Sequence, residues 1–249
     1  MVLCLDIAYF GEPFSGFARQ PGQLTVQGSI EDALKTIFSE EVDTTCAGRT
    51  DAGVHARHQF VSFESPKDDV DLDKLKRSLE QLTHDDIHIN DVEFKDDDFS
   101  ARFSAKAREY SYFICNQPNP SLYMRNTSWH IAKTLDVQSM QKAAQALLGE
   151  HDFKSFCVAK SAEDKTTMRN ISKIEFVEHE IFEEKFIEII ISGNAFLHSM
   201  VRTIVGTLIK VGLGQRDIEW VEEVLLAQNR QSAGECAPAK GLVLMGVYY

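Results

Sequence analysis

The sequence lacks the features that mark several classes of protein. It contains no hydrophobic run close to the roughly 20 residues that cross a membrane as a helix. Its N-terminus, MVLCLDIAYF, has neither a basic region nor a small-residue cleavage site, so no targeting signal is visible. No stretch rich in proline, glycine and serine divides the chain. We therefore expect a cytoplasmic protein that does not bind a membrane.

Cysteine is scarce and scattered. The chain has five cysteines, none of them in a CxxC pair, which argues against a disulfide framework and a zinc site. Phosphate-loop, Rossmann and zinc motifs are also missing. We therefore expect no metal, no nucleotide cofactor and no other cofactor.

The chain has fewer basic than acidic residues, and the two kinds are unevenly distributed along it. The net charge is −12, which by itself argues against a nucleic acid as the partner. The acidic residues are concentrated in 85–98 and 178–185, whereas arginines stand beside the glycine-rich and aromatic motifs. A basic cleft on an acidic body is compatible with this distribution.

The chain is long enough, at 249 residues with 43% hydrophobic content, for one large domain or two joined ones. Hydrophobic periodicity predicts strands at 2–9, 44–48, 58–64 and 87–94, with helices at 25–38 and 72–82. In the second half it predicts strands at 108–115, 171–178, 185–192 and 242–249, with helices at 136–149, 196–212 and 217–228.

Both halves thus follow the order strand, helix, strand, strand, helix, strand, with one extra helix in the second. This order is that of a ferredoxin-like, or split βαβ, unit. We predict an α+β fold in which two such halves, 1–104 and 105–249, form an extended and mainly antiparallel sheet. Helices would cover one face, and a central cleft would lie where the halves meet.

The stretch AGRTDAGVHA, at 47–56, places Asp51 between two glycines. Asp and Gly are common in turns, so a structural turn is one interpretation. The other is a catalytic carboxylate on a bend that a ligand can approach closely. Arg49 favours the second interpretation, because a nearby cation keeps a carboxylate ionised.

Arg202 lies in the apolar stretch FLHSMVRTIVGTLIKV, and no acidic residue occurs between Glu188 and Asp217. A guanidinium in such a helix is rarely buried without a carboxylate or phosphate partner. It either extends to the solvated edge or pairs with Asp51 across the cleft, which would lower the pKa of that aspartate.

Two further segments combine aromatic and polar residues. In AREYSYF, Tyr110 and Tyr112 share one face of a predicted strand near Arg102, Lys106 and Arg108. This pattern is compatible with sheet packing and with base stacking beside phosphates. FSGFARQ, at 14–20, is a loop that could serve as a lid, a nucleic-acid contact or a simple connection.

Together these motifs resemble the tRNA pseudouridine synthase A family. The resemblance rests on AYFGEPFSGFARQ, TVQGSIEDAL, AGRTDAGVHA, FSARFSAKAREYSY, RNISKIEF and NAFLHSMVRTIVGTL, which occur in this order over nearly the whole chain. AGRTDAGVHA followed by NAFLHSMVR is the most specific part. His58, in ARHQF, departs from the small residue expected before Gln59.

The resemblance implies an isomerase that converts uridine to pseudouridine at positions 38, 39 and 40 of tRNA, acts as a homodimer and needs no cofactor. It implies that Asp51 is the catalytic carboxylate, that Tyr110 stacks on the target base and that Arg202 pairs with Asp51. We assign substrate contacts to the polar residues of the motifs: Arg19, Gln20, Arg49, His55, Arg57, Arg102, Lys106 and Tyr110.

Two alternatives remain at this stage. One is a non-catalytic module that binds tRNA as a chaperone with the same stacking residues. The other is a small-molecule enzyme in which Asp51 acts as a general base in a pocket.

Overall fold

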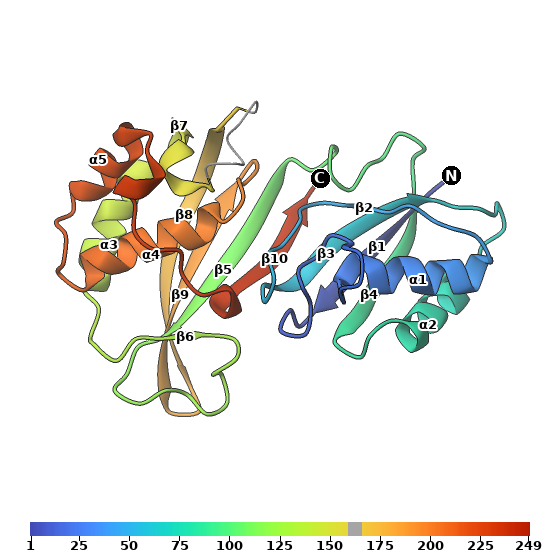
Figure 1. Ribbon diagram of the computed structural model, residues 1–249, viewed down its shortest axis with the longest axis horizontal. Helices are drawn as coiled ribbons and strands as arrows, with labels where there is room; N and C mark the ends of the chain where they lie inside the picture. Colours follow the sequence, from blue (N-terminus) through green and yellow to red (C-terminus); the bar gives the residue numbers. More distant parts are fainter. Residues whose placement is uncertain (159–165) are drawn as a thin grey trace. The chain divides into compact units, whose positions relative to one another are not determined.

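The chain forms two compact units. The first contains Met1–Lys106 together with Val243–Tyr249, and the second contains Ala107–Leu242. The computed structural model describes residues 1–158 and 166–249, and Figure 1 shows the helices and strands of each unit. Within these ranges, no helix has the length and apolar character needed to span a membrane.

The sheet of the first unit is built around its N-terminal strand. It contains β1 (Val2–Tyr9), β2 (Thr45–Cys46), β3 (His55–Glu64), β4 (Ile87–Lys95) and β10 (Leu242–Tyr248). The strand order is β4-β1-β3-β10, and β2 pairs with β3. β1 runs antiparallel to both neighbours, whereas β10 runs parallel to β3. The last residues of the chain therefore complete the sheet that its first residues begin.

Two amphipathic helices pack beside this sheet: α1 (Val26–Phe38) and α2 (Leu72–Leu82). They contact each other, and α2 also packs against β4 (Figure 1). α1 begins after Thr25, whose hydroxyl accepts a hydrogen bond from the Gly28 backbone N–H at 3.2 Å. Ile30 and Leu34 of α1 are fully buried with the side chains of β1. The apolar side chains that recur along α1 thus form part of the core of the unit.

A second group of strands belongs to the second unit. It consists of β5 (Ala107–Cys115), β6 (Trp129–His130), β7 (Gly149–Asp152), β8 (Met168–Ile181) and β9 (Glu184–Gly193). The order is β5-β9-β8-β7 with antiparallel neighbours, and β6 pairs in parallel with β5. Phe182 and Glu183, both at positive φ, form the two-residue turn between β8 and β9.

Three helices gather on one side of β8 and β9 (Figure 1). They are α3 (Val137–Ala144), α4 (Met200–Gly212) and α5 (Trp220–Ala227). α4 is almost entirely buried, and its Ile204 and Leu208 are inaccessible to solvent. The most apolar predicted helix therefore forms the centre of this unit.

The α+β fold class with mainly antiparallel sheets is confirmed. Several predicted boundaries were wrong. The helix predicted at 136–149 leaves the α-helical form after Ala144, and Gly149 begins β7. The helix predicted from 196 begins only at Met200, because Ser199 adopts a left-handed conformation at φ 59°. The strand predicted at 171–178 continues to Ile181 and the one predicted from 185 begins at Glu184, because a two-residue turn suffices to reverse the chain.

The cap of α1 gives a test of this local structure. We expect Thr25→Ala to lower the free energy of unfolding by about 1 kcal/mol, because the Gly28 N–H loses its acceptor. Thr25→Ser should restore most of the loss. Chemical denaturation would measure both, with Thr36→Ala as the control, because the Thr36 hydroxyl bonds only within the helix, to the Asp32 carbonyl. Equal losses for Thr25→Ala and Thr36→Ala would contradict the role of the cap.

Candidate active site

Asp51 lies in a fixed turn between β2 and β3. Its side chain is half-buried, and its carbonyl accepts a hydrogen bond from the Val54 N–H at 3.2 Å. Gly53 takes a positive φ of 78°, a conformation that suits glycine and completes the bend. Thr50 is buried, with its hydroxyl 2.7 Å from that of Tyr9. The backbone on both sides of the carboxylate is therefore held by the protein.

The N-terminal loop after β1 packs directly on this turn. The Phe17 N–H donates to the Thr50 carbonyl at 3.0 Å. A Cβ on Gly16, which has a φ of +98°, would lie 3.2 Å from the same oxygen, and a Cβ on Gly11 would lie 2.1 Å from the Val54 carbonyl oxygen. Only glycine permits this backbone approach at Gly11. The FSGFARQ segment is thus in part a support for the Asp51 turn, with Phe14 and Phe17 buried.

Arg19 and Gln20, from the same loop, make contacts within the first unit. The Arg19 guanidinium bonds to Glu31 at 2.6 Å and to Asp32 at 2.8 Å. These carboxylates, Asp32 first, raise the pKa of Arg19. The Gln20 amide donates to the Ser15 carbonyl at 2.8 Å. Both side chains therefore shape the loop, and their contact with substrate stays a prediction.

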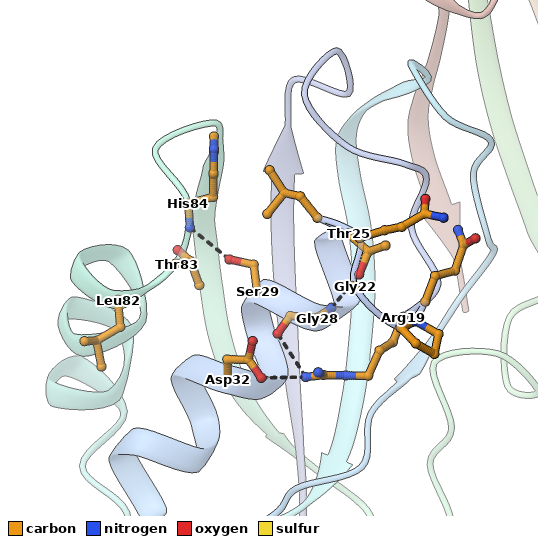
Figure 2. Close-up of a pocket in the computed structure, with 13 residues that line it drawn as sticks. Arg19, Gly22, Thr25, Gly28, Ser29, Asp32, Leu82, Thr83 and His84 are labelled. Atoms are coloured by element: carbon orange, nitrogen blue, oxygen red, sulfur yellow. Dashed lines mark hydrogen bonds and ion pairs between the residues drawn. The ribbon is translucent and has the colours of Figure 1, made fainter.

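Figure 2 shows the hollow that these residues line, between the loop, α1 and the end of α2. It has a volume of about 800 Å³, and its other walls include Leu24, Leu82 and His84. The Arg19–Asp32 ion pair and the hydrogen bond between Ser29 and His84 join residues of its wall (Figure 2). Asp51 does not contribute to its walls, so we do not assign the reaction to this hollow.

His55 is a structural contact of the Asp51 turn. The side chain is buried, and its Nδ1 accepts a hydrogen bond from the Gly11 N–H at 2.9 Å. Its ring packs against Phe10 with centroids 4.6 Å apart. Because Nδ1 is an acceptor, it carries no proton in this arrangement. The histidine fixes the start of the N-terminal loop, and the expected substrate contact stays a prediction.

Arg49 and Arg57 are exposed on either side of the turn, where an anion can reach them. The Arg57 guanidinium donates to the Asn90 amide oxygen at 3.2 Å. His58, the departure from the family pattern, contacts Asp6 at 2.8 Å on a neighbouring strand. The departure is therefore accommodated by a polar partner within the sheet.

Arg102 and Lys106 lie in the segment that ends the main part of the first unit, and both side chains are exposed. The Arg102 guanidinium stands 5.2 Å from the centroid of the Phe103 ring. The Lys106 backbone N–H donates to the Tyr248 carbonyl at 2.8 Å, which ties the segment to β10.

In the second unit, Tyr110 lies on β5 and is largely buried. Its ring meets that of Phe196 edge to face, at 5.2 Å and 88°. The neighbouring Arg108 donates to the Asn194 carbonyl at 2.9 Å, so β5 is attached to the loop before α4 at two points. Phe196 was not singled out in the sequence, although it stands in the NAFLHSMVR motif.

Tyr112 has a different environment from Tyr110. It is fully buried, and its hydroxyl donates to the Pro238 carbonyl at 2.8 Å. Burial raises the pKa of this phenol well above its usual value. Of the two tyrosines, Tyr112 therefore belongs to the core.

Arg202 lies in the first turn of α4 and is half-buried. Its Nε donates to the Ala237 carbonyl at 2.8 Å, while its own backbone carbonyl accepts from the Ala237 N–H at 3.1 Å. The segment that contains Glu235 and Ala237 approaches α4 closely because Gly206 has no side chain. A Cβ at Gly206 would lie 1.8 Å from the Glu235 carbonyl oxygen. Contacts with the backbone therefore set the direction of the Arg202 guanidinium.

The structure thus gathers Asp51 and the basic motif residues in the first unit, and Tyr110 and Arg202 in the second. The pairing of Asp51 with Arg202, and the cleft between the halves, stay predictions. Across residues 1–158 and 166–249, no group of three or more His, Cys, Asp and Glu side chains is arranged to hold a metal ion.

A family model described as tRNA pseudouridine synthase matches residues 7–104 and 143–249. The chain belongs to this family. The two matched segments contain Asp51 and Arg202, whereas Tyr110 lies between them. The resemblance inferred from the motifs is therefore confirmed.

Curated members of the tRNA pseudouridine synthase family match over nearly their full length. The chain is 43% identical to tRNA pseudouridine synthase A of Brevibacillus brevis, covering 98% of this chain and 97% of the relative. It is 41% identical to that of Thermosipho africanus, covering 98% of each. The protein of the same name from Bacillus subtilis is 38% identical, covering 100% of this chain and 99% of the relative.

The close approach at Gly11 leads to a test. We expect Gly11→Ala to lower the rate of the family's reaction by about tenfold or more, because the added methyl displaces the backbone beside Asp51 and small misplacements of a catalytic group are costly. Gly246→Ala is the control: that glycine belongs to β10 of the same unit, and a Cβ there would make only ordinary contacts, the nearest at 3.5 Å from the Tyr248 hydroxyl. Thermal melting would show that both variants fold. A folded Gly11→Ala protein with the wild-type rate would refute the support role of the loop.

Proposed function

We propose that this protein converts uridine to pseudouridine in the anticodon stem-loop of tRNA, at positions 38, 39 and 40, with Asp51 as the catalytic carboxylate. The observation that carries the proposal is the turn of Asp51. In a member of the tRNA pseudouridine synthase family, a half-buried carboxylate stands on backbone held by the N-terminal loop and by β3. Such fixed placement is what a reacting group requires.

The reaction is a rearrangement within one nucleotide. The N1–C1′ bond breaks, the base turns, a C5–C1′ bond forms, and the proton on C5 is lost while N1 gains one. Nothing is oxidised or reduced overall, and no group is transferred from outside. The protein's task is to extract the nucleotide, hold its parts and supply an ionised carboxylate.

The target nucleotide must leave its stack before its sugar and base can be reached. In the proposal, Tyr110 stacks on the flipped base, and its edge-to-face contact with Phe196 fixes the plane of its ring. Tyr110 also stands as the candidate group that takes the proton from C5. Its burial within β5 supports a fixed orientation for both tasks.

Asp51 acts in its ionised form, either as a nucleophile or as a base that removes a sugar proton. Arg202 would pair with it, lower its pKa and set its direction. The anchoring of the Arg202 Nε to the Ala237 carbonyl supports this assignment, because it limits the orientations of the guanidinium. A planar fork held at one nitrogen is suited to a carboxylate partner.

The tRNA would be drawn in by local positive charge on an acidic protein. Arg49, Arg57, Arg102 and Lys106 are all exposed on the first unit, and phosphate contacts by such side chains supply most of the non-specific affinity for nucleic acids. The proposal further includes a cytoplasmic homodimer in which one tRNA contacts both chains. Sedimentation of the protein with and without tRNA would test that stoichiometry.

Replacement of the carboxylate is the direct test. We expect Asp51→Asn to abolish pseudouridine formation, because the amide is neutral and neither attacks nor accepts a proton at neutral pH. Release of tritium from C5 of uridine in labelled tRNA measures the reaction. Asp43→Asn, an exposed aspartate before β2, is the matched control and should keep the wild-type rate.

The binding of tRNA by the Asp51→Asn protein should persist, since its basic residues are unchanged. Turnover by Asp51→Asn would overturn the catalytic role of Asp51. If an inactive Asp51→Ala form nevertheless restored the normal phenotype to cells that lack the protein, the non-catalytic tRNA-binding alternative would be favoured.

Arg202→Lys tests the proposed ion pair. We expect the catalytic rate to fall by at least about tenfold, because a point charge replaces the fork and the Nε–Ala237 hydrogen bond is lost. Arg216→Lys serves as the control, since Arg216 is exposed and stacks on Trp220. Single-turnover kinetics would separate the chemical step from tRNA binding. An unchanged single-turnover rate would contradict the pairing.

A further inference from the structure

Phe103 is placed where a large apolar side chain is unfavourable. It is 79% exposed, the largest value among the exposed large hydrophobic side chains of the described residues. Its immediate neighbours in the chain are Arg102 and Ser104, and Lys106 follows. An exposed ring flanked in sequence by polar residues is unlike the broad apolar patches that bind proteins.

The exposure does not come from a loosely held segment. Ser104 N–H donates to the Ser100 carbonyl at 3.0 Å, and Ser100 N–H donates to the Ser104 hydroxyl at 3.1 Å. These reciprocal bonds close a tight turn whose outer residues are Arg102 and Phe103. The turn therefore presents both side chains to solvent in a defined way.

The turn is also fastened to the sheet. Ala101 is fully buried, its N–H donates to the Ser62 hydroxyl at 3.0 Å, and its carbonyl accepts from the Tyr249 hydroxyl at 2.9 Å. The ring of Tyr249 packs between those of Phe60 and Phe99. Phe103 thus projects from a rigid base, which limits the conformational entropy that binding would cost.

Arg102 completes the arrangement. Its guanidinium lies 5.2 Å from the Phe103 centroid, a cation–π distance that orients both groups. Arg102 and Arg49 both act electrostatically on the buried thiol of Cys46, although burial is the larger effect and raises its pKa to about 11. The two cations therefore lie around the same part of the first unit. Positive charge and an exposed π-face occur together here.

We propose that Phe103 and Arg102 form a stacking platform for an unpaired nucleobase of the tRNA anticodon loop, with the Arg102 guanidinium beside the adjacent phosphate. Base stacking on an exposed aromatic ring accepts any base, because every base has a π-face. An enzyme that acts on neighbouring positions in different tRNAs needs such a sequence-tolerant contact. The inference rests on the proposed function and adds a positioning residue to it.

The test asks whether the aromatic ring of Phe103, and not merely its apolar bulk, binds the RNA. We expect Phe103→Leu to weaken binding of an anticodon stem-loop RNA by about tenfold, since the apolar side chain remains but the π-face is lost. Phe103→Tyr should bind as the wild type does. KM should rise in the leucine variant while kcat stays near the wild-type value, because Phe103 positions the RNA and takes no part in the chemistry.

Phe182→Leu is the matched control, as Phe182 is 69% exposed at the β8–β9 turn of the second unit. A second measurement uses RNAs in which single loop nucleotides are abasic. At one position the missing base should weaken wild-type binding and abolish the difference between wild type and Phe103→Leu. That coupling identifies the stacked base, and a merely structural role for Phe103 would not produce it.

The outcomes separate the inference from the proposed function. Equal RNA affinity and KM for wild type and Phe103→Leu, in an enzyme that forms pseudouridine, would overturn only the platform. A changed oligomeric state in Phe103→Leu with unchanged RNA affinity would also overturn it and identify a protein contact instead. A wild-type protein that binds the stem-loop but forms no pseudouridine would refute the proposed function and leave the platform measurable by binding.

Discussion

The candidate site depends on the approach of one backbone to another. The N-terminal loop lies so close to the Asp51 turn that no side chain fits at Gly11, and Phe17 and His55 add hydrogen bonds that join the two segments. A carboxylate on a bend between strands would otherwise be among the more mobile parts of a protein. Here its backbone is buttressed from both sides, which is the condition for holding an ionised group in one direction.

In the second unit, backbone contacts hold a cationic side chain in place. Arg202 is fixed through its backbone carbonyl and its Nε to a single residue, Ala237, and Gly206 permits the segment around Ala237 to lie on α4. The ring of Tyr110 is oriented by its edge-to-face contact with Phe196. In both units a glycine that accepts a close backbone contact sets the position of a charged side chain, so the sites are defined by main-chain packing.

Sequence reasoning recovered the long strands, the helices and the family, but not β6, β7 or the contacts. Caps such as Thr25 and Asp136 mark helix starts because they act over three residues. The partner of β10 is not encoded locally, and neither is the burial of His55 or the binding of Arg19 by Glu31 and Asp32. Those depend on residues distant in sequence. Gly149 looked like a helix end because a glycine at positive φ serves equally well before a strand.

The parallel pairing of β10 with β3 has a consequence for biosynthesis. The unit that carries Asp51 includes Val243–Tyr249, which are synthesised after the whole of the second unit, and the Tyr249 ring packs against Phe60 and Phe99. A nascent chain stalled anywhere in the second unit would hold an open sheet edge beside the future turn. Assembly of the carboxylate-bearing half must therefore await the synthesis of β10, even though its first hundred or so residues are made early.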